Sequence, residues 1–181
     1  MNSVKRKRVF IGIKIDDTLY GEIQDWKENY KHIPVRWVNR SNLHITLVAP
    51  WYESSISRLI SKLNSLDRSD VSTFDIRFDK VSYGPNPKSP RLIWASGESV
   101  KELITLKKSV LRNFGIPSEK REFTAHLTLA RFQPIEYKYF KVKKIEDSVN
   151  WKMKVNSITL FESKLLRSGV EYSELRSIII S

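Results

Sequence analysis

The chain has 181 residues, of which 40% are hydrophobic, and a formal net charge of +12 from 32 Lys and Arg against 20 Asp and Glu. Such a length and apolar content fit one folded domain over residues 1–181 and exclude a disordered chain. The absence of cysteine excludes disulfides and cysteine-ligated metals. The positive charge favours a polyanion such as RNA, DNA or a nucleotide, although a solvated basic surface explains it equally well.

The start of the chain is basic and then apolar, as in a signal peptide, but Lys14 and Asp16 interrupt its short apolar part. No apolar run approaches the roughly 20 residues that are needed to cross a bilayer. We therefore expect a cytoplasmic protein without a membrane segment.

The spacing of apolar residues predicts a strand, a helix, strands, a helix and strands, and then much the same order again. Strands are expected at 8–15, 35–38, 42–49, 73–84, 91–96, 123–132, 151–163 and 171–180. Helices are expected between Asp16 and Pro34, after Ser54 or Ser55, and over 100–114, with a short helix or turn at 142–148. Because strands often follow strands directly and no linker divides the chain, the order indicates an α+β fold with two lobes in one unit.

Two stretches of the chain resemble each other. "NLHITLVAP" (Asn42–Pro50) and "AHLTLARFQP" (Ala125–Pro134) both contain H-[I/L]-T-L followed by a proline. Threonine occupies seven of the 181 positions, so a threonine two places after two of only three histidines has a chance probability of roughly half a percent, before the matching leucines are counted. The repeat predicts two similar lobes that each present the same tetrapeptide.

The H-x-T spacing has a geometric meaning in a strand. Side chains at i and i+2 point to the same face, so His44 and Thr46 lie together, as do His126 and Thr128. Two such strands that face each other across a cleft surround one small volume with two imidazoles and two hydroxyls. This arrangement suits a phosphodiester, because hydroxyls can bind its oxygens and imidazoles can move protons near neutral pH.

The same residues allow a purely structural interpretation. A single histidine in an amphipathic strand is most often structural, and His32, which has no such partner, is interpreted in that way. Two motifs with matched flanks favour a site. None of the histidines forms an H-E-x-x-H pattern, so we expect neither a metal nor another cofactor.

"VRWVNRSNLHITL" and "REFTAHLTLARF" resemble the 2H phosphoesterase family, and most closely its RNA 2′,3′-cyclic phosphodiesterase branch, also known as tRNA 2′-5′ ligases. The resemblance spans nearly the whole chain and includes "RVFIGIKI", "PRLIWA" and "LFESKLLRSGVEYSEL" in the expected order. It implies a bilobal α+β fold with pseudo-twofold symmetry, in which each lobe has an antiparallel-rich sheet with flanking helices around a central groove. It also implies metal-independent hydrolysis of a ribose 2′,3′-cyclic phosphate to a 2′-phosphomonoester.

The resemblance implies roles for particular residues. His44, Thr46, His126 and Thr128 match the catalytic positions of the family, and Arg131 matches an arginine that assists at the phosphate. Strict alternation puts Arg131 on the opposite face from His126, so it reaches the phosphate only if the strand ends or bulges near Ala130. Symmetry does not distinguish base from acid; we expect His126 as the base for water and His44 as the acid, with roles exchanged in ligation.

Aromatic and basic residues near the motifs are candidates for binding the rest of the substrate. Phe10 and Trp37 are the stacking candidates that we select, with Trp51, Tyr52 and Phe132 as further ones, although each also suits a core position. Arg36, Arg40 and Lys138 are candidate contacts to an RNA backbone, or parts of a solvated face.

Three functions stay open at this stage. The first is a monomeric phosphodiesterase that acts on RNA ending in a 2′,3′-cyclic phosphate. The second keeps the site and changes the substrate to 2′-5′ oligonucleotides, tRNA halves for ligation, or a small cyclic nucleotide. The third is a basic RNA-binding module whose histidines hold phosphate without catalysis.

Overall fold

A computed structural model describes residues 6–69, 71–118, 123–167 and 169–180 of the chain. Its strands are β1 (Lys7–Lys14), β2 (Arg36–Trp37), β3 (His44–Glu53), β4 (Phe74–Gly84), β5 (Leu92–Gly97), β6 (Ala125–Arg131), β7 (Glu146–Val155), β8 (Ser157–Leu166) and β9 (Gly169–Ile179). Its helices are α1 (Asp17–Glu28), α2 (Ile56–Asn64), α3 (Lys101–Phe114), the short α4 (Pro134–Tyr137) and the 3-10 helix η1 (Arg40–Asn42).

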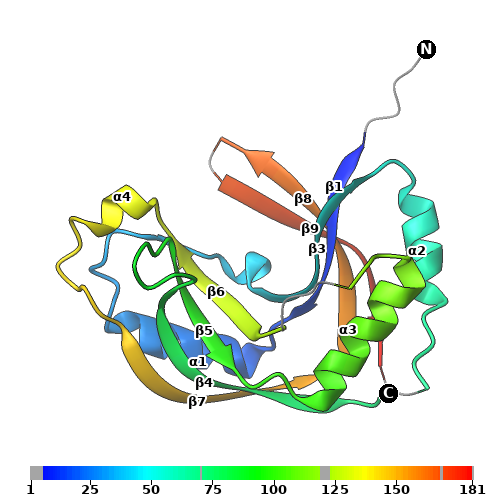
Figure 1. The fold of residues 1–181 in the computed structure, drawn as a ribbon, viewed down its shortest axis with the longest axis horizontal. Coiled ribbons are helices and arrows are strands. Elements are labelled where there is room, and N and C mark those ends of the chain that lie inside the picture. Colours follow the sequence, from blue (N-terminus) through cyan, green and yellow to red (C-terminus); the bar gives the residue numbers. More distant parts are fainter. Residues whose placement is uncertain (1–5, 70, 119–122, 168, 181) are drawn as a thin grey trace.

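All strands belong to one antiparallel sheet in the order β7-β4-β5-β6-β3-β1-β8-β9, and β2 pairs with β6. The order is symmetric about its centre, where β6 corresponds to β3 and β5 to β1. Figure 1 shows the sheet curled into two halves, with β4, β5, β6 and β7 in one and β1, β3, β8 and β9 in the other. The expected bilobal α+β fold is therefore confirmed, and the two lobes share one continuous sheet.

Each lobe is covered by a helix that follows a strand of the other lobe. Helix α1 comes after β1 but packs on the other half, where Trp26 Nε1 donates a hydrogen bond to Asp147 Oδ2 of β7 at 2.7 Å. Helix α3 comes after β5 but lies with α2 beside β3, where the rings of Phe114 and Trp51 are 6.2 Å apart. Separating the lobes would therefore expose both helix contacts.

The burial patterns explain the positions of the strands in the sheet. Residues Val9 to Ile13 of β1 are all buried, as expected for a central strand with both faces covered. In β4, Phe74 and Ile76 are buried while the charged residues between and after them are exposed, so this strand has one solvated face. No helix in the described part of the chain is long and apolar enough to span a membrane.

The predicted helix ends are confirmed where local chemistry defines them. Asp16 caps α1, since its Oδ1 accepts the Leu19 backbone N–H at 2.8 Å. Gly115 ends α3 with a φ of 68°, a left-handed conformation that glycine adopts without a steric cost.

Two element predictions are wrong. The expected single strand 151–163 is two strands, because the chain turns at Asn156 and leaves one edge of the sheet, where β7 pairs with β4, for the other half, where β8 pairs with β1. The short helix or turn expected at 142–148 is also absent, since residues 142–145 form neither and β7 begins at Glu146. A short helix forms earlier instead, where Gln133 and Glu136 make a capping box around Pro134.

Candidate active site

The two H-x-T motifs lie on neighbouring strands at the centre of the sheet. Ile45 of β3 pairs with Leu127 of β6 in antiparallel register. Extending this register by one residue in each direction places His44 across from Thr128, and Thr46 across from His126. The four motif side chains are half-buried on one face, whereas Ile45 and Leu127 are fully buried on the other. The two motifs thus lie side by side on strands that are adjacent in one sheet, and the strands do not face each other across a cleft.

Both imidazoles are held by the same type of hydrogen bond. His44 Nδ1 donates to the backbone carbonyl of Asn42 at 2.7 Å, and His126 Nδ1 donates to that of Thr124 at 2.9 Å. A carbonyl can only accept, so Nδ1 carries the proton in both rings and Nε2 is left free for chemistry. His44 Nε2 lies 3.1 Å from Thr46 Oγ1, whose hydroxyl can donate to it. The carbonyl two residues before each histidine therefore fixes the tautomer of that histidine.

His44 lies in an aromatic environment. Its ring centroid is 4.7 Å from that of Phe10 and 5.0 Å from that of Tyr172, which stands perpendicular to it. This burial lowers the pKa of His44 from 6.5 to about 4; the carbonyl of Asn42 acts in the opposite direction, and the charges of Arg131 and His126 lower the pKa further. His44 is therefore neutral at pH 7 in the free protein, which does not favour the acid role expected from the sequence.

His126 has a different environment, although its motif is the same. Among the described rings it contacts that of Trp94, with centroids 5.3 Å apart and planes at 54°. The charge of His126 is felt by His44, so the two imidazoles are close enough to interact. The site combines two histidines that have the same tautomer and different aromatic neighbours.

A bulge brings Arg131 to the side of the motif threonine. Along β6, Thr128 pairs with Trp94 of β5 and Ala130 pairs with Ile93, so Leu129 has no partner on β5. The extra residue reverses the alternation, because Leu129 and Ala130 are both buried and Arg131 then returns to the face of Thr128. Arg131 accordingly lines the same pocket as His44 and Thr128, as the conditional expectation required.

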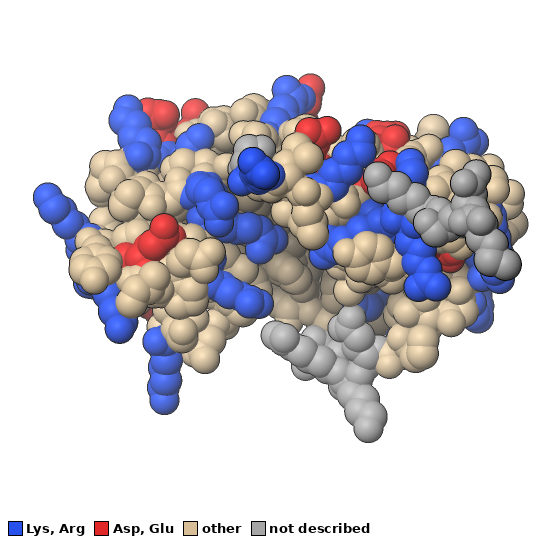
Figure 2. All heavy atoms as spheres, turned by 90° about the horizontal axis from the view of Figure 1, so that it is seen from above, with Lys and Arg blue, Asp and Glu red and all other residues tan. Residues whose placement is uncertain are grey.

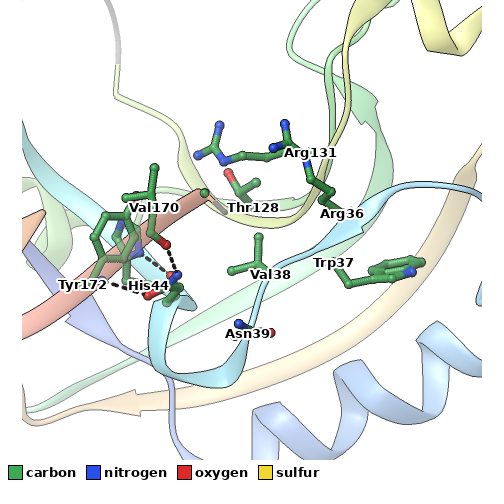
Figure 3. Close-up of a pocket in the computed structure, with 11 residues that line it drawn as sticks. Arg36, Trp37, Val38, Asn39, His44, Thr128, Arg131, Val170 and Tyr172 are labelled. Atoms are coloured by element: carbon green, nitrogen blue, oxygen red, sulfur yellow. Dashed lines mark hydrogen bonds between the residues drawn. The ribbon is translucent and has the colours of Figure 1, made fainter. Parts of the chain in front are cut away.

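This pocket has a volume of about 200 Å³ and lies over β6. Of the residues selected from the sequence, it is lined by His44, Thr128, Arg131 and Trp37, while Thr46 and His126 are not part of its lining. Figure 3 shows Arg131 above Thr128, with His44 and Tyr172 on the opposite wall. Arg36 also lines the pocket, whereas the ring of Tyr20 lies 4.9 Å from the guanidinium of Arg40, outside it.

The two selected stacking candidates have different positions. Phe10 is only 1% exposed and its ring contacts His44 and Phe161, so it leaves no free face for a nucleobase and supports the histidine instead. Trp37 is half-buried at the far end of the pocket, with Lys27 Nζ 5.3 Å from its ring centroid. Of these two, Trp37 remains a candidate for contact with a base.

Asn42 and Tyr172 line the pocket but were not selected from the sequence. The Asn42 side chain donates from Nδ2 to the carbonyl of Val170 at 2.7 Å and accepts the Tyr172 N–H at 3.1 Å. These bonds hold the start of β9 against the first motif. Asn42 lies two residues before His44, which is a usable local signal, whereas nothing near Tyr172 in the chain indicates its position beside His44.

The charge around the site is positive. Within the described ranges, no Asp or Glu lines the pocket, and no group of three or more His, Cys, Asp or Glu could hold a metal ion. Figure 2 shows the molecule from above, and on this face Lys and Arg are more numerous than Asp and Glu. This face suits an anionic ligand.

A bilobal antiparallel sheet that joins two H-x-T motifs at its centre defines the two-histidine phosphoesterase class. A model of the 2′-5′ RNA ligase superfamily matches residues 15–165, and the chain belongs to that superfamily.

Several proteins are similar over most of the chain. An RNA 2′,3′-cyclic phosphodiesterase of Archaeoglobus fulgidus is 29% identical over 176 residues, which cover 93% of this chain and 98% of that protein. A Bacillus subtilis protein of the same name is 28% identical and covers 70% of this chain and 72% of its own. The apo structure of Escherichia coli LigT has the same fold, with a TM-score of 0.74 at 24% identity over 97% of this chain and 98% of its own.

Proposed function

We propose that the protein hydrolyses the 2′,3′-cyclic phosphate at an RNA end to a 2′-phosphomonoester, without a metal ion. The observation that carries this proposal is the row formed by His44, Thr128, Thr46 and His126 across the β3–β6 pair. In both imidazoles Nδ1 donates to a carbonyl, so the unprotonated Nε2 is the nitrogen that exchanges protons with the substrate. The curated relatives that bear the name RNA 2′,3′-cyclic phosphodiesterase support the same activity.

The reaction needs a base and an acid on opposite sides of phosphorus. A neutral imidazole takes a proton from water, whose oxygen bonds to phosphorus as the bond from phosphorus to O3′ breaks, and an imidazolium protonates O3′. We assign His44 as the base, since its pKa of about 4 keeps it neutral at pH 7, and His126 as the acid. This reverses the assignment expected from the sequence.

The remaining polar groups of the row bind the phosphate. The Thr46 and Thr128 hydroxyls and the Arg131 guanidinium are the donors that stabilise the negative charge on the oxygens as the fifth bond forms. Fixed donors of this kind supply the stabilisation that a metal ion supplies in other phosphoesterases. Because each half of the chain contributes one motif, a single chain completes the site, and we propose that residues 1–181 act as one domain and as a monomer.

The test uses purified, EDTA-treated protein and an RNA that ends in a 2′,3′-cyclic phosphate, followed by phosphorus NMR. We expect a 2′-monophosphate with the wild type, and a loss of rate on the order of 10²-fold or more in His44→Ala and in His126→Ala. His32→Ala is the matched control, because His32 is exposed and outside the pocket. Unchanged substrate with the wild type, or full activity in either motif variant, would contradict the proposal. Binding without turnover would favour an RNA-binding module.

A further inference from the structure

Arg36 and Arg131 form a pair of like charges across two strands. They are register partners in the β2–β6 pairing, and both line the pocket. Figure 3 shows the two side chains next to each other on the wall above Thr128. Like charges in directly opposite positions of an antiparallel pair destabilise it, so an arrangement of this kind needs a compensating group.

No residue that the structure describes supplies that compensation. Among the described hydrogen bonds and ion pairs, none involves the guanidinium of Arg36 or of Arg131, and no described carboxylate lines their pocket. Another cross-strand pair of basic residues, Arg77 and Lys152, shares its pocket with three carboxylates, those of Asp75, Asp79 and Glu98. The charge of the arginine pair is therefore open to an external anion.

The position of the pair is fixed relative to the reacting centre. Strand β2 lies along the same edge of β6 as β3 does, since Leu127 pairs with Ile45 of β3 while Arg131 pairs with Arg36 of β2. The Val38 N–H, which donates to the Leu129 carbonyl at 2.8 Å, holds the segment between these pairings to β6. The pocket thus extends along β6 from the H-x-T row to Arg131, and from there across to Arg36 on β2.

We infer that Arg36 binds the phosphodiester that precedes the terminal cyclic phosphate, so that the preferred substrate is an oligonucleotide and not a mononucleoside cyclic phosphate. This inference rests on the proposed function. Arg131 lies on the same strand as Thr128 and its charge acts on His44, so it serves the reacting phosphate, and Arg36 on β2 serves the preceding phosphate of the RNA. When the two guanidiniums bind two successive phosphates, each has an anionic partner, and these partners offset the repulsion between the arginines.

Three substrates test the inference: a mononucleoside 2′,3′-cyclic phosphate, a dinucleotide that ends in the same group, and that dinucleotide with an uncharged methylphosphonate linkage. For the wild type, we expect kcat/KM for the charged dinucleotide to exceed the other two values on the order of tenfold. Arg36→Gln should abolish most of this preference. Arg58→Gln, an equal change of net charge on the exposed face of α2, should keep it.

Calorimetric binding of the two dinucleotides with 2′-phosphate ends gives a readout that does not need turnover. The charged linkage should bind on the order of tenfold more tightly to the wild type and to Arg58→Gln, but not to Arg36→Gln. Equal affinity of the wild type for both linkages, or an equal loss for both in Arg36→Gln, overturns the inference. Failure of the wild type to hydrolyse any cyclic substrate contradicts the proposed function, and the binding difference still decides the inference.

Discussion

The backbone carbonyl of Asn42 accepts the Nδ1–H of His44 at 2.7 Å, while the side chain of the same asparagine binds the backbone of β9 at Val170 and Tyr172. One residue thus connects the tautomer of a histidine in β3 to the strand that places an aromatic ring beside it. Its counterpart two residues before His126, Thr124, is exposed and makes its contact with the ring through the carbonyl. The two motifs therefore have the same sequence pattern, but only the first is preceded by a residue whose side chain is described as hydrogen-bonded to another strand.

The Asn42 link predicts a defect in both stability and turnover. Asn42→Ala removes two hydrogen bonds to β9, which should lower the free energy of unfolding by about 1–3 kcal/mol. It should also lower kcat, because Tyr172 is no longer held against His44, while the carbonyl that orients the ring is kept. Urea unfolding and steady-state kinetics measure the two effects. Asn150→Ala, at an exposed position of β7, is the control, and equal behaviour of the two variants would contradict the link.

The burial of His44 predicts how stability depends on pH. Its pKa is about 4 in the folded protein and about 6.5 when unfolded, so between these values the unfolded state binds more protons. The free energy of unfolding should therefore fall as the pH is lowered from about 6.5 to about 4, by about 3 kcal/mol from this group. His44→Gln cannot titrate and should show a flatter dependence in urea titrations across this range. Parallel curves for the wild type and His44→Gln would refute the assignment, and the exposed His32→Gln should keep the wild-type slope.

The proposed division of roles predicts which variant a better leaving group rescues. With sulfur in place of the 3′ oxygen, the departing thiolate needs little protonation, since thiol pKa values are near 8.5. His126→Ala should regain on the order of 10²-fold in rate on this substrate relative to the oxygen substrate, and His44→Ala should not. Single-turnover rates on the two substrates provide the measurement. Rescue of His44→Ala alone would restore the opposite assignment, with His44 as the acid.

The contact between α1 and β7 predicts that the free energy of unfolding depends strongly on the carboxylate of Asp147. Asp147 accepts hydrogen bonds from Trp26 Nε1 at 2.7 Å and from the Tyr30 hydroxyl at 3.1 Å, and burial together with Asp147 raises the pKa of Tyr30 to about 12. Asp147→Ala leaves both donors without this acceptor and should destabilise the protein by about 2–4 kcal/mol. Guanidinium unfolding measures the change. Asp75→Ala on the solvated face of β4 should cost far less, and an equal loss would contradict the argument.

Local patterns determined much of this protein. The i, i+2 spacing places His44 with Thr46 and His126 with Thr128 on one face of a strand, whatever surrounds the strand. The carboxylate of Asp16 and the missing Cβ of Gly115 define helix ends through contacts within a few residues. Such features follow from the sequence because their physical cause lies in the same short segment.

Only the tertiary structure decided the features that depend on distant segments. Arg131 reaches the pocket because Leu129 forms a bulge in the pairing of β6 with β5. His44 is neutral because Phe10 and Tyr172, from strands near the two ends of the chain, pack against its ring and bury it. The break at Asn156 exists because β7 and β8 have partners in different lobes. Strand register and side-chain burial are properties of the assembled sheet. The alternation of residues along one strand does not show where its pairing with a neighbouring strand contains a bulge.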